Sequence, residues 1–138
     1  MDLLAPLRPL TYAKVPIEGR WQQSPFPEHT IGERPVAVLC DDPDVATLVV
    51  DRVDGTVLFV TKDDVPALVN RSLGQLVESA RIYSGAARRA RGIDEDDDEA
   101  LEALAAATTD HIGRIDPDAV RDENQVWAVA AEELGYGL

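Results

Sequence analysis

The chain has 138 residues and a formal net charge of −13, from 13 Lys and Arg against 26 Asp and Glu. This acidity argues against nucleic acids and anionic membranes as partners, because proteins bind phosphate groups with Lys and Arg. A basic protein or a divalent cation is the natural complement, although solubility alone would also explain the charge. Hydrophobic residues make up 45% of the chain, so we expect a core and a single domain over residues 1–138.

Cys40 is the only cysteine, which rules out an internal disulfide framework and favours a reducing compartment. It ends the apolar run of residues 36–40, so we expect a small buried hydrophobic residue rather than a nucleophile. The N-terminus lacks the basic and apolar regions of a signal peptide, and no apolar run reaches the length of a membrane span. These features predict a soluble protein of the cytoplasm.

The first segment, residues 1–29, is an arm rich in proline. Because proline lacks an N–H group and breaks helices, we expect extended or irregular chain here, mobile in part over residues 1–9, with a short strand within residues 10–17. Trp21 and Phe26 are its large apolar groups, and we expect Trp21 to fill part of the core rather than to form a ligand platform.

The centre of the chain predicts strands joined by tight turns. A strand is expected over residues 36–40, followed by a turn at residues 41–44. Two β-branched runs, residues 45–53 and 56–60, are then joined by Asp54-Gly55, a dipeptide typical of a two-residue type I′ hairpin turn.

This turn fixes a register in which Val50 pairs with Phe59. One face of the hairpin then carries Leu48, Val50, Val57 and Phe59, and the other carries Val49, Val53, Leu58 and Val60. Because both faces are apolar, we expect the hairpin to be central and covered on both sides. Asp51 and Arg52 lie near the turn, where we expect the sheet to meet water.

Helices follow the strands. Ser72-x-x-Gln75 is a capping box that predicts a helix start, and the helix is expected to end between residues 83 and 90. Its apolar positions follow one helical stripe: Leu73, Leu76, Val77, Ala80, Tyr83 and Ala87.

A second helix is expected over residues 96–112, ended by Gly113. Its apolar face is Leu101, Leu104, Ala105, Thr108 and Ile112. Asp116-Pro117 predicts a short helical turn, and Asp122-x-x-Gln125 predicts the start of a last helix with Val126, Trp127, Ala130 and Leu134 facing inward. Strands followed by helices predict an α+β fold, with a small antiparallel or mixed sheet around a central hairpin and C-terminal helices packed on it.

Catalytic and metal-binding motifs are not found in the sequence. His29 lies in the proline-rich arm, and His111 lies at a helix end, where it favours the helix dipole. No nucleophile motif, phosphate-binding glycine loop or H-E-x-x-H pattern occurs, so we predict neither an enzyme nor a cofactor. An EF-hand loop from Asp94 is excluded, because its sixth position is Glu99 and its twelfth is Ala105.

The acidity is concentrated in the last third of the chain. Residues 1–93 carry 11 basic and 12 acidic side chains, whereas residues 94–138 carry 2 and 14. The densest run is Asp94, Glu95, Asp96, Asp97, Asp98 and Glu99, which we take as the candidate partner-binding residues. The alternative is local: arginines end one helix and carboxylates open the next, so each charge complements a helix dipole.

Four short motifs along residues 30–138 carry a family resemblance. They are Thr30-Ile31-Gly32-Glu33, the hairpin with its Asp54-Gly55 turn, Val69-Asn70-Arg71-Ser72-Leu73, and Ile115-Asp116-Pro117 followed by Trp127 and Glu132-Glu133-Leu134. Together they resemble the SUKH-4 type of bacterial immunity protein, in which a V-N-S-S-L-like motif opens the helix after the hairpin. Arg71 stands where that motif has its first serine.

The resemblance implies a non-enzymatic cytoplasmic protein that binds and neutralises a cognate toxin, often a nuclease or a nucleic-acid deaminase. A toxin that acts on nucleic acid tends to have a basic cleft, which an acidic protein could fill. An adaptor of the same fold, which binds a regulatory partner or a second copy of the chain, is the alternative, and an exposed apolar sheet face would favour it. A small enzyme would require His29 or His111 to line a pocket with a carboxylate.

Overall fold

A computed structural model describes residues 16–17, 19–22, 25–42 and 45–137. The segment expected to be mobile, and most of the short strand expected within residues 10–17, lie outside these residues. The described strands are β1 (Arg20–Trp21), β2 (Glu28–Ile31), β3 (Arg34–Asp42), β4 (Ala46–Asp51), β5 (Val57–Thr61) and β6 (Pro66–Asn70). The described helices are α2 (Leu73–Arg91), α3 (Asp98–Ile115), the 3-10 turn η2 (Pro117–Val120) and α4 (Val126–Gly135). The α+β prediction, with helices at the C-terminal end, is confirmed.

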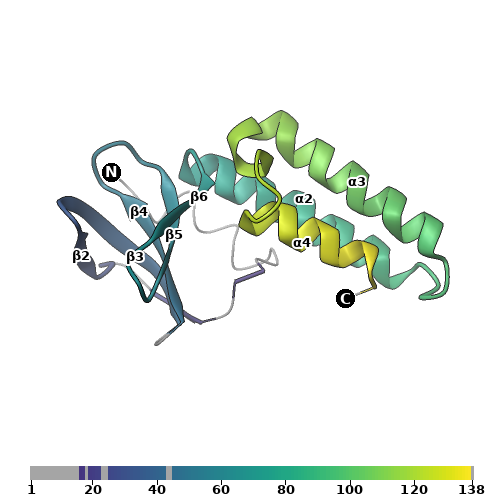
Figure 1. The fold of residues 1–138 in the computed structure, drawn as a ribbon, viewed down its shortest axis with the longest axis horizontal. Coiled ribbons are helices and arrows are strands. Elements are labelled where there is room, and N and C mark those ends of the chain that lie inside the picture. The colour runs from purple at the N-terminus through teal and green to yellow at the C-terminus, as the bar shows by residue number, and fades with distance from the viewer. Residues whose placement is uncertain (1–15, 18, 23–24, 43–44, 138) are drawn as a thin grey trace.

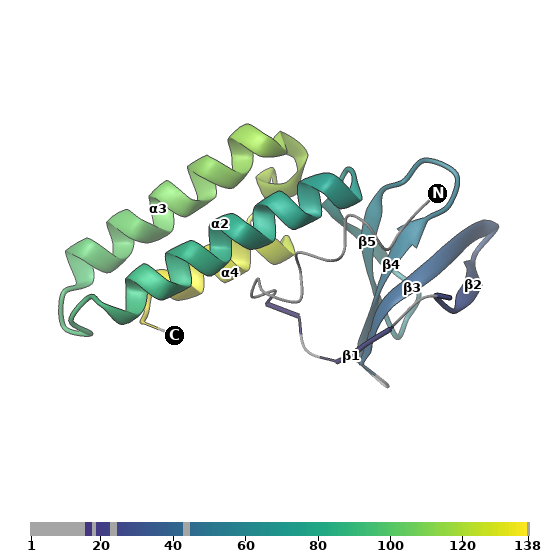
Figure 2. The ribbon, with the colours of Figure 1, turned by 180° about the vertical axis from the view of Figure 1, so that it is seen from behind.

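The strands form one antiparallel sheet in the order β1-β3-β4-β5-β6, with β2 also paired to β3. The three long helices lie side by side and extend away from one side of the sheet, so the molecule is elongated (Figure 1; Figure 2). The connection between α2 and α3 is at the end of this helical layer that is far from the sheet.

The hairpin is present, but its turn is longer than predicted. Val50 pairs with Val57 instead of Phe59, so the register differs from the prediction by two residues. Asp51 is the reason: it is only 2% exposed, and its carboxylate accepts the N–H groups of Val53 (2.8 Å) and Asp54 (3.4 Å). This local capping favours a wider turn, closed by the N–H of Gly55 donating to the carbonyl of Asp51 with Gly55 at φ 81°.

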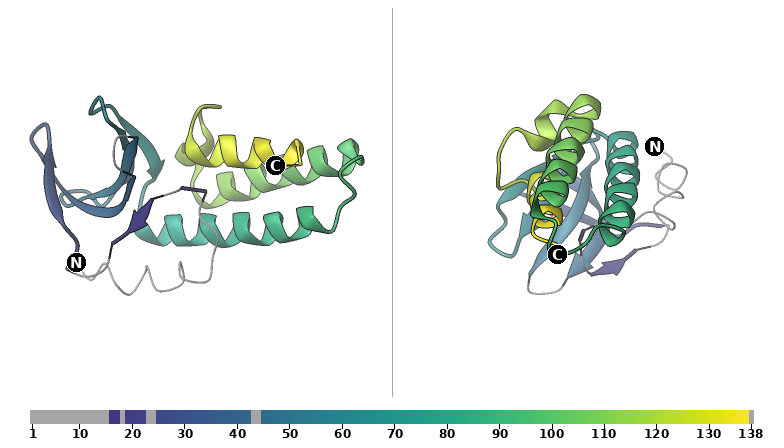
Figure 3. Two further views of the ribbon diagram at one scale, coloured as in Figure 1. Left: turned by 90° about the horizontal axis from the view of Figure 1, so that it is seen from below. Right: turned by 90° about the vertical axis from the view of Figure 1, so that its right-hand side faces the viewer.

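Both faces of the hairpin are buried, as predicted, because a shift of two residues leaves each side chain on its original face. Leu48, Val50 and Val57 pack against the helices, whereas Val49, Leu58 and Val60 form a second cluster with Val36 and Val38. This second cluster is buried because the sheet curls around it (Figure 3). Val53 does not belong to it: the residue lies in the turn and is 80% exposed.

Two predictions about the arm have opposite outcomes. Phe26 is half-buried against the main core, as expected of an anchor. Trp21 is 41% exposed, so the prediction that it fills the core is wrong. Its strand, β1, has only two residues and lies at the edge of the sheet, where little chain can cover the indole ring.

The helical stripes are confirmed, but several helix boundaries differ by a few residues. All six predicted stripe residues of α2 are buried, and so are Trp127 and Leu134 in α4. Helix α2 ends at Arg91, beyond the expected range. Helix α3 continues through Gly113, where a side chain would crowd Val120, so this glycine allows close packing and does not end the helix.

Helix α4 begins at Val126, four residues after the predicted Asp122. The side chain of Gln125 accepts the N–H of Asp122 at 2.7 Å, so the capping pattern closes a turn before the helix. Within the described residues, no helix combines the length and the apolar character needed to span a membrane.

Candidate functional site

A buried polar joint connects the sheet to all of the long helices. Asn70, at the end of β6 and fully buried, donates to Asp116 Oδ2 (3.0 Å) and to Ser79 Oγ of α2 (3.1 Å). Its own Oδ1 accepts from Trp127 Nε1 of α4 at 2.7 Å. Asp116, just after α3, also accepts the backbone N–H of Arg71 at 2.8 Å.

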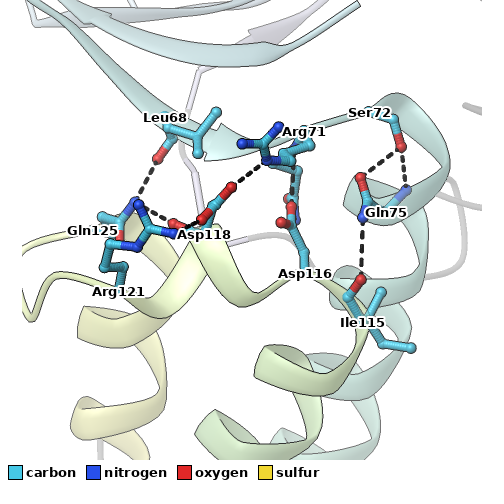
Figure 4. A network of polar contacts seen from close by, with 10 residues as sticks. Leu68, Arg71, Ser72, Gln75, Ile115, Asp116, Asp118, Arg121 and Gln125 are labelled. Carbon is cyan, nitrogen blue, oxygen red and sulfur yellow. Dashed lines mark hydrogen bonds and ion pairs between the residues drawn. The ribbon is translucent and has the colours of Figure 1, made fainter.

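An outer layer of polar contacts covers this joint (Figure 4). Arg71 and Arg121 both pair with the carboxylate of Asp118, and the hydrogen bond from Arg71 is the largest cause that lowers the pKa of Asp118. Gln75, whose N–H is accepted by the Ser72 hydroxyl, donates to the carbonyl of Ile115 at 3.1 Å. The segment opening α2 and the segment closing α3 are therefore held together by side chains from both.

The six acidic candidates lie together on the connection between α2 and α3 and in the first turn of α3, and all are exposed. Two of them have local roles: Asp97 caps α3 by accepting the N–H of Ala100 (3.1 Å), and Asp94 accepts the N–H of Asp96 (3.0 Å). None of the six takes part in a salt bridge within the described part of the chain. We call residues 94–99 the acidic tip.

A hollow opens in the sheet face opposite the helices, and sequence reasoning missed it. It has a volume of about 230 Å³, and Ile31, Val38, Val49 and Val60 contribute to its apolar lining. The lining also includes Asp41, Asp42 and Asp64, together with His29 and Lys62. A smaller hollow of about 130 Å³ shares His29, Val38, Asp41 and Thr47 with it.

Asp41 reaches this face because β3 contains a bulge. Val38 pairs with Val49 and Cys40 pairs with Leu48, so Leu39 is an extra residue without a partner in the β3–β4 ladder. Side chains alternate between faces along a strand, and the extra residue reverses that alternation for the rest of β3. Asp41 therefore shares a row with Thr47, whose hydroxyl donates to its carboxylate at 3.3 Å.

The two histidines lie in different settings. His111 is exposed on α3, whereas His29 lines the hollow together with Asp41 and Asp42. The structure gives His29 no hydrogen bond to a carboxylate within the described residues. In that same part of the chain, no group of three or more His, Cys, Asp or Glu could hold a metal ion.

The chain matches the family model described as SUKH-4 immunity protein over residues 10–133. The chain belongs to the SUKH-4 immunity protein family. No curated protein and no solved structure matches it.

Family membership supports an immunity role for this SUKH-4 protein, and the family implies binding to a cognate toxin and suggests a non-enzymatic role. Two of the four motifs that carried the resemblance have a structural role, because Asn70, Asp116 and Trp127 meet in the buried joint. These two motifs therefore hold the sheet and the helices together. Asp64 and Asp41 carried no motif that could have indicated the hollow.

Proposed function

We propose that this SUKH-4 protein neutralises a basic toxin that acts on nucleic acid, a nuclease or a nucleic-acid deaminase, inside the producing cell. The whole chain would act as one binding domain in the cytoplasm and would block the toxin by occupying the cleft that takes its substrate. The observation that carries this proposal is the placement of charge, because an active cleft for nucleic acid must attract phosphate and is therefore basic.

The acidic tip supports this proposal. Its six carboxylates are exposed and have no cationic partner among the described residues, so their field extends into solvent. A concentrated patch of one sign accelerates encounter with a partner of the opposite sign. We propose that Asp94, Glu95, Asp96, Asp97, Asp98 and Glu99 first attract the toxin and then lie at the edge of the contact.

Within its described residues, the structure lacks the exposed apolar sheet face that would have favoured an adaptor. An adaptor was expected to present an exposed apolar sheet face. Instead, Val36, Val38, Val49, Leu58 and Val60 on the second face are each at most 8% exposed, because the sheet curls over them. We therefore prefer the toxin-binding proposal to an adaptor or a dimer built on that face.

Co-expression tests the proposal. The product of the gene next to the one encoding this chain is expressed from a tunable promoter in a bacterial host, with and without this chain. We expect growth arrest with degraded or deaminated nucleic acid in its absence, and normal growth with a co-purifying complex in its presence. A neighbouring product that is harmless, or whose toxicity persists beside folded chain, would contradict the proposal.

A further inference from the structure

We propose that the hollow in the sheet receives a lysine or arginine side chain of the toxin. This inference rests on the proposed function and adds a second contact surface to it. The hollow is distinct from the acidic tip, which is at the far end of the helical layer (Figure 2).

The size of the hollow indicates what it can hold. Pockets for drug-sized molecules and cofactors have volumes of about 300–1,000 Å³. The hollow, at about 230 Å³, is smaller, so it suits one long side chain better than a cofactor.

The lining matches the two halves of a basic side chain. Ile31 is half-buried and Val45 is 57% exposed, and both line the hollow, so they offer an apolar surface to a methylene stem. Lysine and arginine bury their stems on apolar surface and keep the charged group at a polar edge. Carboxylates from the end of β3 and from the turn between β5 and β6 provide that edge: Asp41, Asp42 and Asp64.

Within the described residues, the three carboxylates at the hollow outnumber the one lysine that lines it. None of the three carboxylates takes part in a salt bridge among the described residues, although Lys62 also lines the hollow. Asp41 and Asp42 are partly buried, where an ion pair is less weakened by water than at a fully exposed site. A guanidinium or ammonium group from the toxin would complete the pairing.

Asp42→Asn with Asp64→Asn tests the proposal, because both changes keep the shape of the side chain and remove its charge. Asparagine also tolerates the positive φ of 59° at position 64. The matched control is Asp63→Asn with Glu33→Gln, which changes the net charge equally at exposed positions outside the lining. The readout is the dissociation rate constant of the complex with the neighbouring gene product, measured by surface plasmon resonance.

We expect the hollow variant to dissociate at least about tenfold faster than wild type, and the control to stay within about twofold. Equal rates for the two variants would overturn the proposal. If the wild-type chain does not bind the neighbouring product, the proposed function fails. A probe that needs no toxin then tests whether the hollow binds a basic side chain. That probe is acetyl-Gly-Arg-Gly-amide, titrated into labelled chain and followed by NMR, with acetyl-Gly-Glu-Gly-amide as its control.

In that titration we expect the amide signals of residues around the hollow to shift with the arginine peptide only, and the shifts to disappear in the hollow variant. Shifts spread over all acidic surfaces, or no shifts, would overturn the proposed side-chain site. If the shifts are confined to the hollow but the toxin does not bind, the hollow is a site for a basic side chain, and the proposal that the toxin supplies this side chain is overturned.

Discussion

The carboxylate of Asp116 joins the sheet to the helices by accepting from the Asn70 side chain and from the backbone N–H of Arg71. It is fully buried, and its other oxygen, Oδ1, has no hydrogen-bond partner among the described residues. A buried donor that loses its acceptor costs about 1–3 kcal/mol, so one substitution here affects two donors at once.

Asp116→Ala is therefore expected to lower the free energy of unfolding by about 3 kcal/mol, measured by urea denaturation. Asp116→Asn keeps one acceptor oxygen and should lose clearly less. The control is Asp110→Ala, at an exposed residue that pairs with Arg114, which should change stability by less than about 0.5 kcal/mol. Similar losses for Asp116→Ala and Asp110→Ala would show that the joint does not stabilise the fold.

Cys40 provides a second test at this scale, because burial raises the pKa of its thiol to about 11, with Asp42 and Asp41 adding to the rise. The thiolate is the reactive form, and a pKa two units above the ordinary 9.0 lowers its population at pH 8 by about 100-fold. We expect iodoacetamide to label the folded chain at least about 100-fold more slowly than the chain in urea. Comparable labelling rates would contradict the buried position of Cys40.

Among the elements, the helices could be predicted well from the sequence, and the sheet only in part. The burial of a stripe such as Leu73, Leu76 and Val77 can be predicted from the sequence, because helical periodicity depends only on residues close together in the chain. Strand β2 could not be found this way, because three of its four residues are exposed. Strand β6 was missed because it starts at Pro66; proline is tolerated there because it is the first residue of a strand that lies at the edge of the sheet.

The two proposed binding surfaces also differ in how well the sequence predicts them. The acidic tip was visible as a run of six carboxylates, although the sequence could not separate capping residues such as Asp97 from unpartnered ones. The hollow depends on the bulge at Leu39 and on strand pairing that brings Asp41, Asp64 and His29 to one face. Those are non-local arrangements, so no short motif records them.

The packing of α2 against the sheet gives a prediction for this element. Leu76 is fully buried in the main core, so Leu76→Asp places a charge where it has neither water nor a partner. We expect this variant to be unfolded by circular dichroism at 25 °C. Val53→Asp is the matched control, since it makes a similar change at a residue that is 80% exposed, and it should fold normally. A folded Leu76→Asp variant would mean that the helix face is wrongly assigned.

At the scale of the whole molecule, the two proposed contact surfaces are both acidic and lie far apart. The acidic tip occupies the end of the helices that is far from the sheet (Figure 1), whereas the residues that line the hollow belong to the sheet and its turns. Long-range attraction sets the association rate, whereas close contacts set the dissociation rate. The two surfaces should therefore affect different rate constants.

Reversing Glu95, Asp96 and Asp98 to lysine should slow association with the toxin by about tenfold at low salt and flatten its salt dependence. Asp97 is left unchanged because it caps α3. The control reverses Glu33, Glu123 and Glu133, three exposed carboxylates elsewhere, and produces the same change in net charge. If both triple variants slow association equally, total charge matters and the acidic tip has no special role.

The central claim is that this SUKH-4 protein binds its toxin directly and thereby abolishes the toxin's action on nucleic acid. Isothermal titration calorimetry of the purified chain with the purified neighbouring gene product, paired with an assay of the product's activity on nucleic acid, tests it most directly. We predict a 1:1 complex with a dissociation constant below about 1 μM, and activity that falls in proportion to the complex formed. Two folded proteins that show no binding, or a complex in which the toxin stays fully active, would contradict the claim.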